Sequence, residues 1–531
     1  MMCSKNGRAP AAALGYAVER IVDGSGFHTA NGVAFGPDGR LYAASVLGES
    51  IFALDLATGA IETVVGPFAG ESDDLVFTQA GDLIWTALLE GAVRMRTADG
   101  RMRDLATGLD GANSIALTRD GKRLFVGQVF MGEGLWEIDL AGLAPPRLVA
   151  EHTGGLNAFQ FGADGMIYAP SWERGQVVRV DPESGHTTIL AEGFGKPGAV
   201  RFDSAERLYV LDDATGELFT LDEQKPLWAP RLVARLATGT DNFAVGPGDL
   251  LYVSSMVDNS IHEVDPRSGA VRTVVAGGLG FPRAMALSSG PEGERLHLAD
   301  SCAYRVVDPR TGAVSDMARA VATPLKFPTS VSVGPHHVVL TGEVFGVVQL
   351  FDRDGNFVRD VGGFEQPSAA IELDDGSLVV AEPISGRITQ ASGDDRRAVA
   401  TGLHHPAVLA DAGGGMLYVG ESGTGRLLRI AIADGTVSEI ARDLGAIRAL
   451  AVTPDGAVAV LDVEARRVVL IASGGGCVEV ARNLPVGYLR EPYPRSGGLA
   501  IGGDGTVYVA ADVENAIYRV AWTAPSQEKV R

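Results

Sequence analysis

The chain has 531 residues and a formal net charge of −21 at pH 7, which argues against nucleic acid as a partner because phosphates require a basic surface. Its three cysteines are far apart and lack metal-ligand spacing, so we expect a reducing compartment and no disulfide framework. The N-terminus has no apolar stretch long enough for a signal peptide or a membrane span, and we therefore expect a cytoplasmic protein.

One pattern of strands and turns recurs along the chain with a period of about 40–45 residues. Each copy contains an apolar strand, a PDG-like turn and three further strands, which is typical of one blade of a β-propeller. The copies in the first half begin at Asn31, Asp73, Asn113, Asn157, Gly198 and Asp241. Those in the second half begin near Arg283, Thr329, Pro367, Pro406, Arg448 and Gly497.

Propellers usually close at four to eight blades, so twelve copies predict two rings rather than one. The sequence therefore predicts an all-β fold of tandem six-bladed propellers, with residues 17–280 in the first ring and residues 281–531 in the second. Residues 17–24 form a strand that precedes the first copy, and the last copy lacks a fourth strand. Because unpaired strand edges are costly, we expect residues 17–24 to complete the sixth blade. Residues 270–277 would then cross over to complete the twelfth.

The first residue of the innermost strand should lie at the mouth of each channel. In the first half, this register gives Asn31, Asp73, Asn113, Asn157 and Asp241, interrupted by Gly198. Oxygen ligands of this kind suit a hard divalent cation, with Ca²⁺ preferred and Mg²⁺ or Mn²⁺ as alternatives. The same side chains also cap turns in many proteins. The second half has no such ring at this register, which favours a functional first channel.

The loops that follow the second strand of each blade should lie on the same face as this ring. Together they predict an apolar collar over a polar floor, as in a site for small molecules, although such loops also simply pack on one another. The residues expected to contact a substrate are Gln128, Phe130, Met131, Trp172, Leu88, Asp212 and Met256. His28 and His152 each precede a ring residue, so each is a candidate general base unless it is only a surface residue.

Residues 17–280 resemble the senescence marker protein/gluconolactonase family, whose relatives include diisopropylfluorophosphatase and the paraoxonases. The resemblance rests on the stretch NSIALTRDGKRLFVG from Asn113, on Asn157 one blade later, and on the Asp241-Asn242 pair. It implies a six-bladed propeller with a divalent ion held by a Glu, two Asn on consecutive blades and an Asp. Asn113 and Asn157 match the two asparagines. Asn31 and Gly198 stand where that family has Glu and Asp, so the negative charge would come from Asp73 and Asp241.

The second half resembles NHL-type repeats, as in DVENAIYRV from Asp512. An acid ends the second strand of each of its blades, and we expect it to brace the turn of its own blade. These acids are Asp300, Glu343, Glu382, Glu421, Asp462 and Asp512. Arg283 and Arg448 would neutralise some of them as a salt-bridged plug, which predicts a structural or interaction role. His404 and His405 flank the same channel mouth, so a second functional site there is an alternative.

The hypothesis that best fits these patterns is a divalent-cation-dependent hydrolase of a small lactone or ester with a hydrophobic or aromatic body. Asp73 or Asp241 would be the nucleophile or base, with His152 and His28 as alternative bases. One rival is a metal-dependent lyase or isomerase on the same site, and another is a propeller that only binds a ligand or protein. For the hydrolase we expect a small-molecule substrate as the partner, and we expect neither a nucleic acid nor a membrane.

Overall fold

The computed structural model describes residues 8–67, 69–472, 476–488 and 497–523. These residues form twelve antiparallel sheets, eleven with four strands and one with five, together with one short 3-10 helix (Pro247–Asp249). They divide into two compact units, one of residues 26–278 and 321–323, the other of residues 1–25, 279–320 and 324–531. The fold is therefore all-β, as the repeat predicted.

The first ring consists of six blades, each a meander of four strands. Its strands are β3 (Val33–Phe35), β4 (Leu41–Ser45), β5 (Ser50–Leu54), β6 (Ile61–Val65); β7 (Leu75–Phe77), β8 (Leu83–Ala87), β9 (Ala92–Arg96), β10 (Met102–Ala106); β11 (Ala112–Leu117), β12 (Leu124–Gln128), β13 (Leu135–Ile138), β14 (Arg147–Ala150); β15 (Gln160–Phe161), β16 (Ile167–Ser171), β17 (Gln176–Val180), β18 (Thr187–Glu192); β19 (Pro197–Phe202), β20 (Leu208–Asp212), β21 (Glu217–Asp222), β22 (Ala229–Arg235); and β23 (Thr240–Val245), β24 (Leu251–Ser255), β25 (Ser260–Asp265), β26 (Ala270–Val275).

The second ring repeats this plan. Its strands are β27 (Ala284–Gly290), β28 (Gly293–Asp300), β29 (Ala303–Val307), β30 (Val314–Arg319); β31 (Ser330–Val333), β32 (Val338–Gly342), β33 (Val347–Phe351), β34 (Phe357–Val361); β35 (Ala369–Glu372), β36 (Leu378–Glu382), β37 (Arg387–Ser392), β38 (Asp395–Ala400); β39 (Pro406–Gly413), β40 (Met416–Glu421), β41 (Arg426–Ala431), β42 (Val437–Ala441); β43 (Ile447–Val452), β44 (Val458–Asp462), β45 (Arg467–Ile471), β46 (Cys477–Arg482), with the short β1 (Ala11–Ala12) added to β46; and β47 (Gly498–Ile501), β48 (Val507–Ala511), β49 (Ala516–Trp522), with β2 (Tyr16–Val22) added to β49.

Contacts between innermost strands close both rings. In the first ring β3, β7, β11, β15, β19 and β23 each contact the next, and β23 contacts β3. In the second ring the same holds for β27, β31, β35, β39, β43 and β47, and β47 contacts β27. Each ring therefore has six blades around a central channel, and the two rings are tandem propellers.

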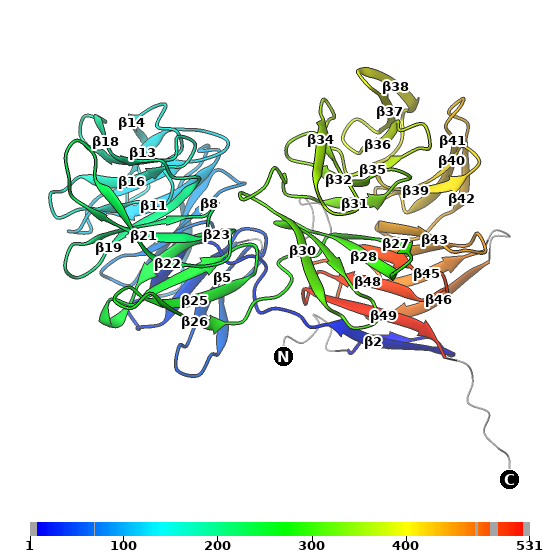
Figure 1. Ribbon diagram of the computed structural model, residues 1–531, viewed down its shortest axis with the longest axis horizontal. Helices are drawn as coiled ribbons and strands as arrows, with labels where there is room; N and C mark the ends of the chain where they lie inside the picture. Colours follow the sequence, from blue (N-terminus) through cyan, green and yellow to red (C-terminus); the bar gives the residue numbers. More distant parts are fainter. Residues whose placement is uncertain (1–7, 68, 473–475, 489–496, 524–531) are drawn as a thin grey trace, which may run out of the picture. The chain divides into compact units, whose positions relative to one another are not determined.

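The predicted crossover between the rings was wrong. The N-terminal strand β2 pairs with β49, with Val18 opposite Val520, so it completes the twelfth blade and not the sixth. In Figure 1, β2 (blue) lies beside β49 (red). The sixth blade is completed by its own strand β26, where Val271 is opposite Val264. Residues before Gly26 consequently belong with the second ring rather than the first.

A tight turn explains why β26 stays in its own blade. The turn between β25 and β26 is four residues long, and the Gly269 N–H donates to the Asp265 carbonyl at 2.8 Å. Gly269 has φ +73°, a conformation that favours glycine. Such a short loop costs little closure entropy, whereas a crossover to a distant blade would cost more. Among the described residues, the twelfth blade alone has no local fourth strand, and β2 supplies it.

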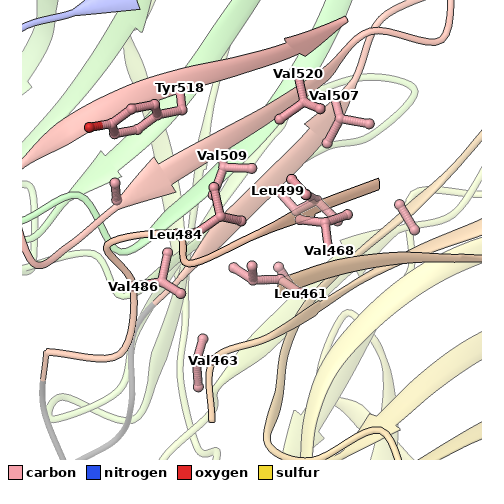
Figure 2. Packing of buried hydrophobic residues seen from close by; sticks show 14 of the residues in the cluster. Leu461, Val463, Val468, Leu484, Val486, Leu499, Val507, Val509, Tyr518 and Val520 are labelled. Atoms are coloured by element: carbon pink, nitrogen blue, oxygen red, sulfur yellow. The ribbon is translucent and has the colours of Figure 1, made fainter. Parts of the chain in front are cut away.

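Neighbouring blades pack face to face through branched aliphatic side chains. Between the eleventh and twelfth blades, Leu461 and Val468 meet Leu499 and Val509, all at most 3% exposed (Figure 2). Burying each such side chain contributes about 1.5–3 kcal/mol. The second strands are buried along their length, as in β4, while fourth strands such as β10 are mostly exposed. The hydrophobic cores therefore lie between neighbouring blades, and the polar side chains at the channel are not part of them. In the described part of the chain, no helix has the length and apolar character needed to cross a membrane.

Candidate functional site

The polar ring predicted from the sequence lies at the start of the innermost strands of the first ring. Asn31 is 6%, Asp73 8% and Asn113 3% exposed. The loop after β4 covers this end, because the Val46 N–H donates to Asn31 Oδ1 at 3.1 Å. The loops after the second strands therefore lie on the same face as the ring, as expected.

Two carboxylates of the ring interact closely. Asn31 Nδ2 donates to Asp241 Oδ1 at 3.4 Å. Burial raises the pKa of Asp241 to about 7, against the lowering effect of that hydrogen bond. Burial also raises the pKa of Asp73 well above its usual value, and the nearby Asp241 raises it further. Among the described residues neither carboxylate has an ion pair, so each must hold a proton or face a cation that the chain does not supply.

A third carboxylate, Asp213, belongs to this group and was not foreseen. It occupies the space that the missing side chain of Gly198 leaves, since a Cβ on Gly198 would lie 1.9 Å from Asp213 Oδ2. Thr240 Oγ1 donates to Asp213 Oδ1 at 3.1 Å. Burial raises the pKa of Asp213 well above its usual value, and Asp241 raises it further. The gap at Gly198 in the ring is thus filled by an acid from the loop after β20.

Asp212, predicted to contact a substrate, instead bonds to the backbone of its own blade. Its two carboxylate oxygens accept from the N–H groups of Gly195 at 2.7 Å and Lys196 at 2.9 Å. The sequence signal for the channel acid was the pair Asp212-Asp213 after a buried strand. Which member turns inward depends on the backbone of the turn, which the repeat pattern does not specify.

A second polar layer lies further along the innermost strands and is neutralised internally. Asp74 and Asn242 directly follow ring residues, and Arg201 lies three residues after Gly198. Arg201 Nη2 donates to Asn242 Oδ1 at 2.9 Å and lies 3.9 Å from Asp74 Oδ2. Asn242 Nδ2 in turn donates to Asp74 Oδ1 at 3.3 Å. Burial lowers the pKa of Arg201, and Asp74 raises it. Asp74 therefore has a cationic partner, in contrast to Asp73, its neighbour in the sequence.

Glu71 is another buried acid that the repeat pattern missed, because it lies outside the strand register. Its Oε1 accepts from the Leu89 N–H at 3.0 Å. Its Oε2 has no hydrogen-bond partner among the described residues. Burial raises the pKa of Glu71 to about 7. Glu71 also contributes to the raised pKa of Asp73 and so adds to the excess of acid at this mouth.

The asparagines test whether a cation fits here. Asn113 Oδ1 is buried and has no hydrogen-bond partner in the described part of the chain, a costly state for an amide. Asn157 Oδ1 accepts only from the Ala158 N–H, at 2.9 Å. No cluster of three or more His, Cys, Asp or Glu among the described residues is arranged to hold a metal. A cation at this mouth would therefore need amide oxygens beside the carboxylates, a mixture that suits Ca²⁺.

The two candidate histidine bases differ in exposure. His28 is 2% exposed, and its carbonyl accepts from Ser45 Oγ at 2.5 Å. His152 is exposed and has φ +51°, and its carbonyl accepts from Arg174. His28 thus lies within the first blade, and His152 lies on a surface turn. The stronger candidates for proton transfer are the acids at the mouth, whose pKa values burial raises.

The predicted collar is partly exposed and partly built into the walls. Phe130 and Met131 are 50% and 46% exposed, and the Phe130 ring meets Trp172 edge to face at 5.0 Å. Leu88 and Met256 are buried. The Gln128 amide is bonded within its own blade, because its Nε2 donates to the Asp110 carbonyl at 2.8 Å and its Oε1 accepts from Trp136 Nε1 at 2.7 Å. The accessible apolar surface is therefore that of Phe130 and Met131.

In the second ring, most of the predicted acids do brace their blades. Glu382, for example, accepts from Arg387 Nε at 2.7 Å and from the Glu365 N–H at 2.7 Å. Asp300, Glu421, Asp462 and Asp512 likewise accept from backbone N–H groups of their blades. Glu343 is the exception. In its blade Gln349 takes this role, accepting from the Lys326 N–H at 2.7 Å, and Glu343 lines the channel instead.

Comparisons with known proteins give one weak structural similarity. No family model matches the sequence, and no curated protein matches it. Among solved structures, one described as a candidate gluconolactonase is similar, with 16% sequence identity and a TM-score of 0.37. The similarity covers 51% of this chain and 99% of that one. At this identity and score it carries no argument about activity.

Proposed function

We propose that the first ring is a divalent-cation-dependent hydrolase of a small lactone or ester with a hydrophobic or aromatic body. The observation that carries the proposal is a buried group of three acids, Asp73, Asp213 and Asp241, whose pKa values are raised and which have no ion pair among the described residues. Isolated buried carboxylates are costly, and a bound cation would remove that cost.

The donor set favours Ca²⁺ over Zn²⁺ or copper. Side chains that would hold the ion are Asn31, Asp73, Asn113, Asn157, Asp213 and Asp241, all of them oxygen donors. When bound, such an ion polarises a carbonyl and stabilises an oxyanion. Mg²⁺ and Mn²⁺ remain alternatives because they accept the same oxygens.

The residues at the mouth divide the remaining tasks. Burial raises the pKa of Asp241 to about 7 in the absence of an ion, and a bound cation would lower it and leave an ionised carboxylate that can accept a proton as a general base. Phe130 and Met131 expose apolar surface on the loop after β12 and would contact the body of the substrate. Asn31, bonded to Asp241, would hold that carboxylate in place.

The test is metal content together with turnover. We expect about one Ca²⁺ per chain by elemental mass spectrometry in the purified protein, and loss of the ion in an Asp73→Asn/Asp213→Asn variant. A panel of aryl esters and lactones, with Ca²⁺, Mg²⁺ or Mn²⁺ added, should show turnover in the parent only. An ion without turnover would leave a lyase or isomerase reaction on the same site, which releases product without oxygen from labelled water. Absence of an ion after calcium is supplied would overturn the proposal in favour of a ligand-binding propeller.

A further inference from the structure

The channel of the second ring contains a cavity of about 90 Å³. It lies at the start of the innermost strands, the register that carries acids in the first ring. Its walls are about equally polar and apolar, and the polar lining residues are Thr329, Ser330, Ser368, Arg283, Glu343 and Arg448. The space suffices for a few water molecules or for a small organic molecule with few heavy atoms.

Arg283 is the residue that makes this cavity unusual. Two hydrogen bonds fix its backbone: its N–H donates to the Ala299 carbonyl at 2.8 Å, and its carbonyl accepts from the Gly497 N–H at 3.2 Å. Its guanidinium has no hydrogen bond or ion pair with any described residue. Burial lowers the pKa of Arg283, and Glu343 and Asp512 raise it. A guanidinium with five N–H donors, set in a partly apolar cavity, therefore lacks an acceptor.

The nearby acids do not fill that role. Asp512 accepts from the N–H groups of Gly487 and Tyr488, each at 2.8 Å, and so braces its own blade. Glu343 is close enough to Arg283 and Arg448 for both to lower its pKa, against the raising effect of burial. Glu343 lines the same cavity as Arg283, and among the described residues no hydrogen bond or ion pair joins the two side chains. The cavity therefore offers a guanidinium donor and a carboxylate acceptor that are not bonded to each other.

We propose that this cavity binds a small organic monocarboxylate, whose carboxylate meets Arg283 and whose hydroxyl or ammonium group donates to Glu343. The planar guanidinium matches a carboxylate through two parallel hydrogen bonds. The carboxylate of Glu343 near the guanidinium disfavours a phosphate dianion, and the apolar side chains among the lining residues favour an organic ligand. The proposal does not depend on the activity of the first ring.

Calorimetric titration of the full chain with acetate, glycolate and inorganic phosphate tests this assignment. We expect saturable binding of both carboxylates, with glycolate stronger than acetate because only glycolate carries a hydroxyl for Glu343. Arg283→Ala should weaken both at least ten-fold, and Arg283→Lys should weaken them less, since it keeps the charge and loses the fork. Glu343→Gln should bring the glycolate and acetate affinities together.

Two controls separate the site from general effects. Arg310 is exposed and pairs with Asp308 on a turn of the same ring, so Arg310→Ala should leave binding unchanged. Asp73→Asn, in the first ring, should also leave it unchanged, whatever it does to metal content. No binding of any carboxylate, or unchanged binding in a folded Arg283→Ala protein, would overturn the site. Tighter binding of phosphate than of glycolate would overturn the monocarboxylate assignment.

Discussion

The two rings share one blade plan and carry opposite charges at the same place. At the mouth of the first channel, Asp73, Asp213 and Asp241 are acids with no cation from the described chain. In the second channel, the guanidinium of Arg283 has no hydrogen bond or ion pair with a described residue, and burial lowers its pKa. Asp73, Asp241 and Arg283 occupy the same position of the repeat, at the start of an innermost strand, so the residue at that position determines the sign of the charge, while Asp213 comes from the loop after β20.

The rings also differ in how they brace their blades. The first ring uses hydroxyls at the end of the second strand, as where Ser171 Oγ donates to the Thr153 carbonyl at 2.7 Å and Ser255 Oγ to the Gly239 carbonyl at 3.2 Å. The second ring uses an acid with an Arg five residues later, as in Glu382 and Arg387. Asp212 is an exception in the first ring, because it braces its blade while its neighbour Asp213 fills the gap in the polar ring. Glu343 is the exception in the second ring, because Gln349 braces its blade instead.

The largest expected effect comes from removing β1 and β2, which only the second ring uses. Deleting residues 8–22 exposes the edge of β49 and removes its backbone hydrogen bonds. Since each contributes about 0.5–1.5 kcal/mol net, the second ring should lose about 4 kcal/mol or more. Calorimetry should show a lower unfolding temperature for the second ring and an unchanged one for the first.

The control for that deletion is Glu19→Gln, which removes an exposed ion pair with Arg519 and keeps the strand. It should cost less than about 1 kcal/mol. Equal destabilisation of both transitions by the deletion would contradict the assignment of β2 to one ring.

The next effect concerns Asp241 at the mouth of the first channel. Asp241 has a folded pKa of about 7, raised above its unfolded value, so it binds a proton more readily when folded. Without divalent ions its contribution to stability is full below about pH 4 and is lost as the pH rises to about 7. In chelator, the free energy of unfolding should therefore fall over this range by on the order of 2–4 kcal/mol more than in Asp241→Asn.

Denaturant unfolding at several pH values, with and without Ca²⁺, measures this difference. Added Ca²⁺ should stabilise the parent most at pH 7–8 and have little effect on the Asp241→Asn protein. Identical pH profiles of the parent and the variant in chelator would show that the carboxylate is not desolvated as described.

A smaller effect compares two acids within the second ring. Glu382→Gln weakens a brace to Arg387 and should cost about 2 kcal/mol, as for other hydrogen bonds to charged groups. Glu343→Gln breaks no brace and should cost less than about 0.5 kcal/mol. Urea unfolding of the two variants side by side gives the comparison, and equal costs would remove the distinction drawn for Glu343.

The smallest effect on stability is expected at the collar. Phe130 is half exposed, so Phe130→Ala should change stability by less than about 1 kcal/mol. If Phe130 contacts the substrate body, KM should rise several-fold while kcat changes little. Met102→Ala is a matched control, because Met102 is 45% exposed on β10, a fourth strand. A KM shift of the same size in both variants would argue against a collar.

Much of the fold could be predicted from the repeat, because the number of blades and the order of strands follow from a sequence pattern that occurs twelve times in the chain. The oxygen ring could be read too, since it has one register. Which strand completes the sixth and twelfth blades could not be predicted from the sequence. The choice between β26 and β2 depends on the local turn at Gly269 and not on the pattern of strands. The sequence did not predict Asp213 and Glu71 as site residues for a related reason. Both lie outside the repeat position that carries the polar ring, and their burial depends on neighbouring loops.

The pairing of β2 with β49 makes the first ring an insertion within the second. During synthesis the residues of β2 leave the ribosome first and must wait, unpaired, until β49 follows about 500 residues later, at a rate of about 5–20 residues per second. The inserted ring can fold meanwhile, because all its strands are local. The waiting strand is thus exposed for tens of seconds, and a chaperone that shields extended segments would have its natural target there.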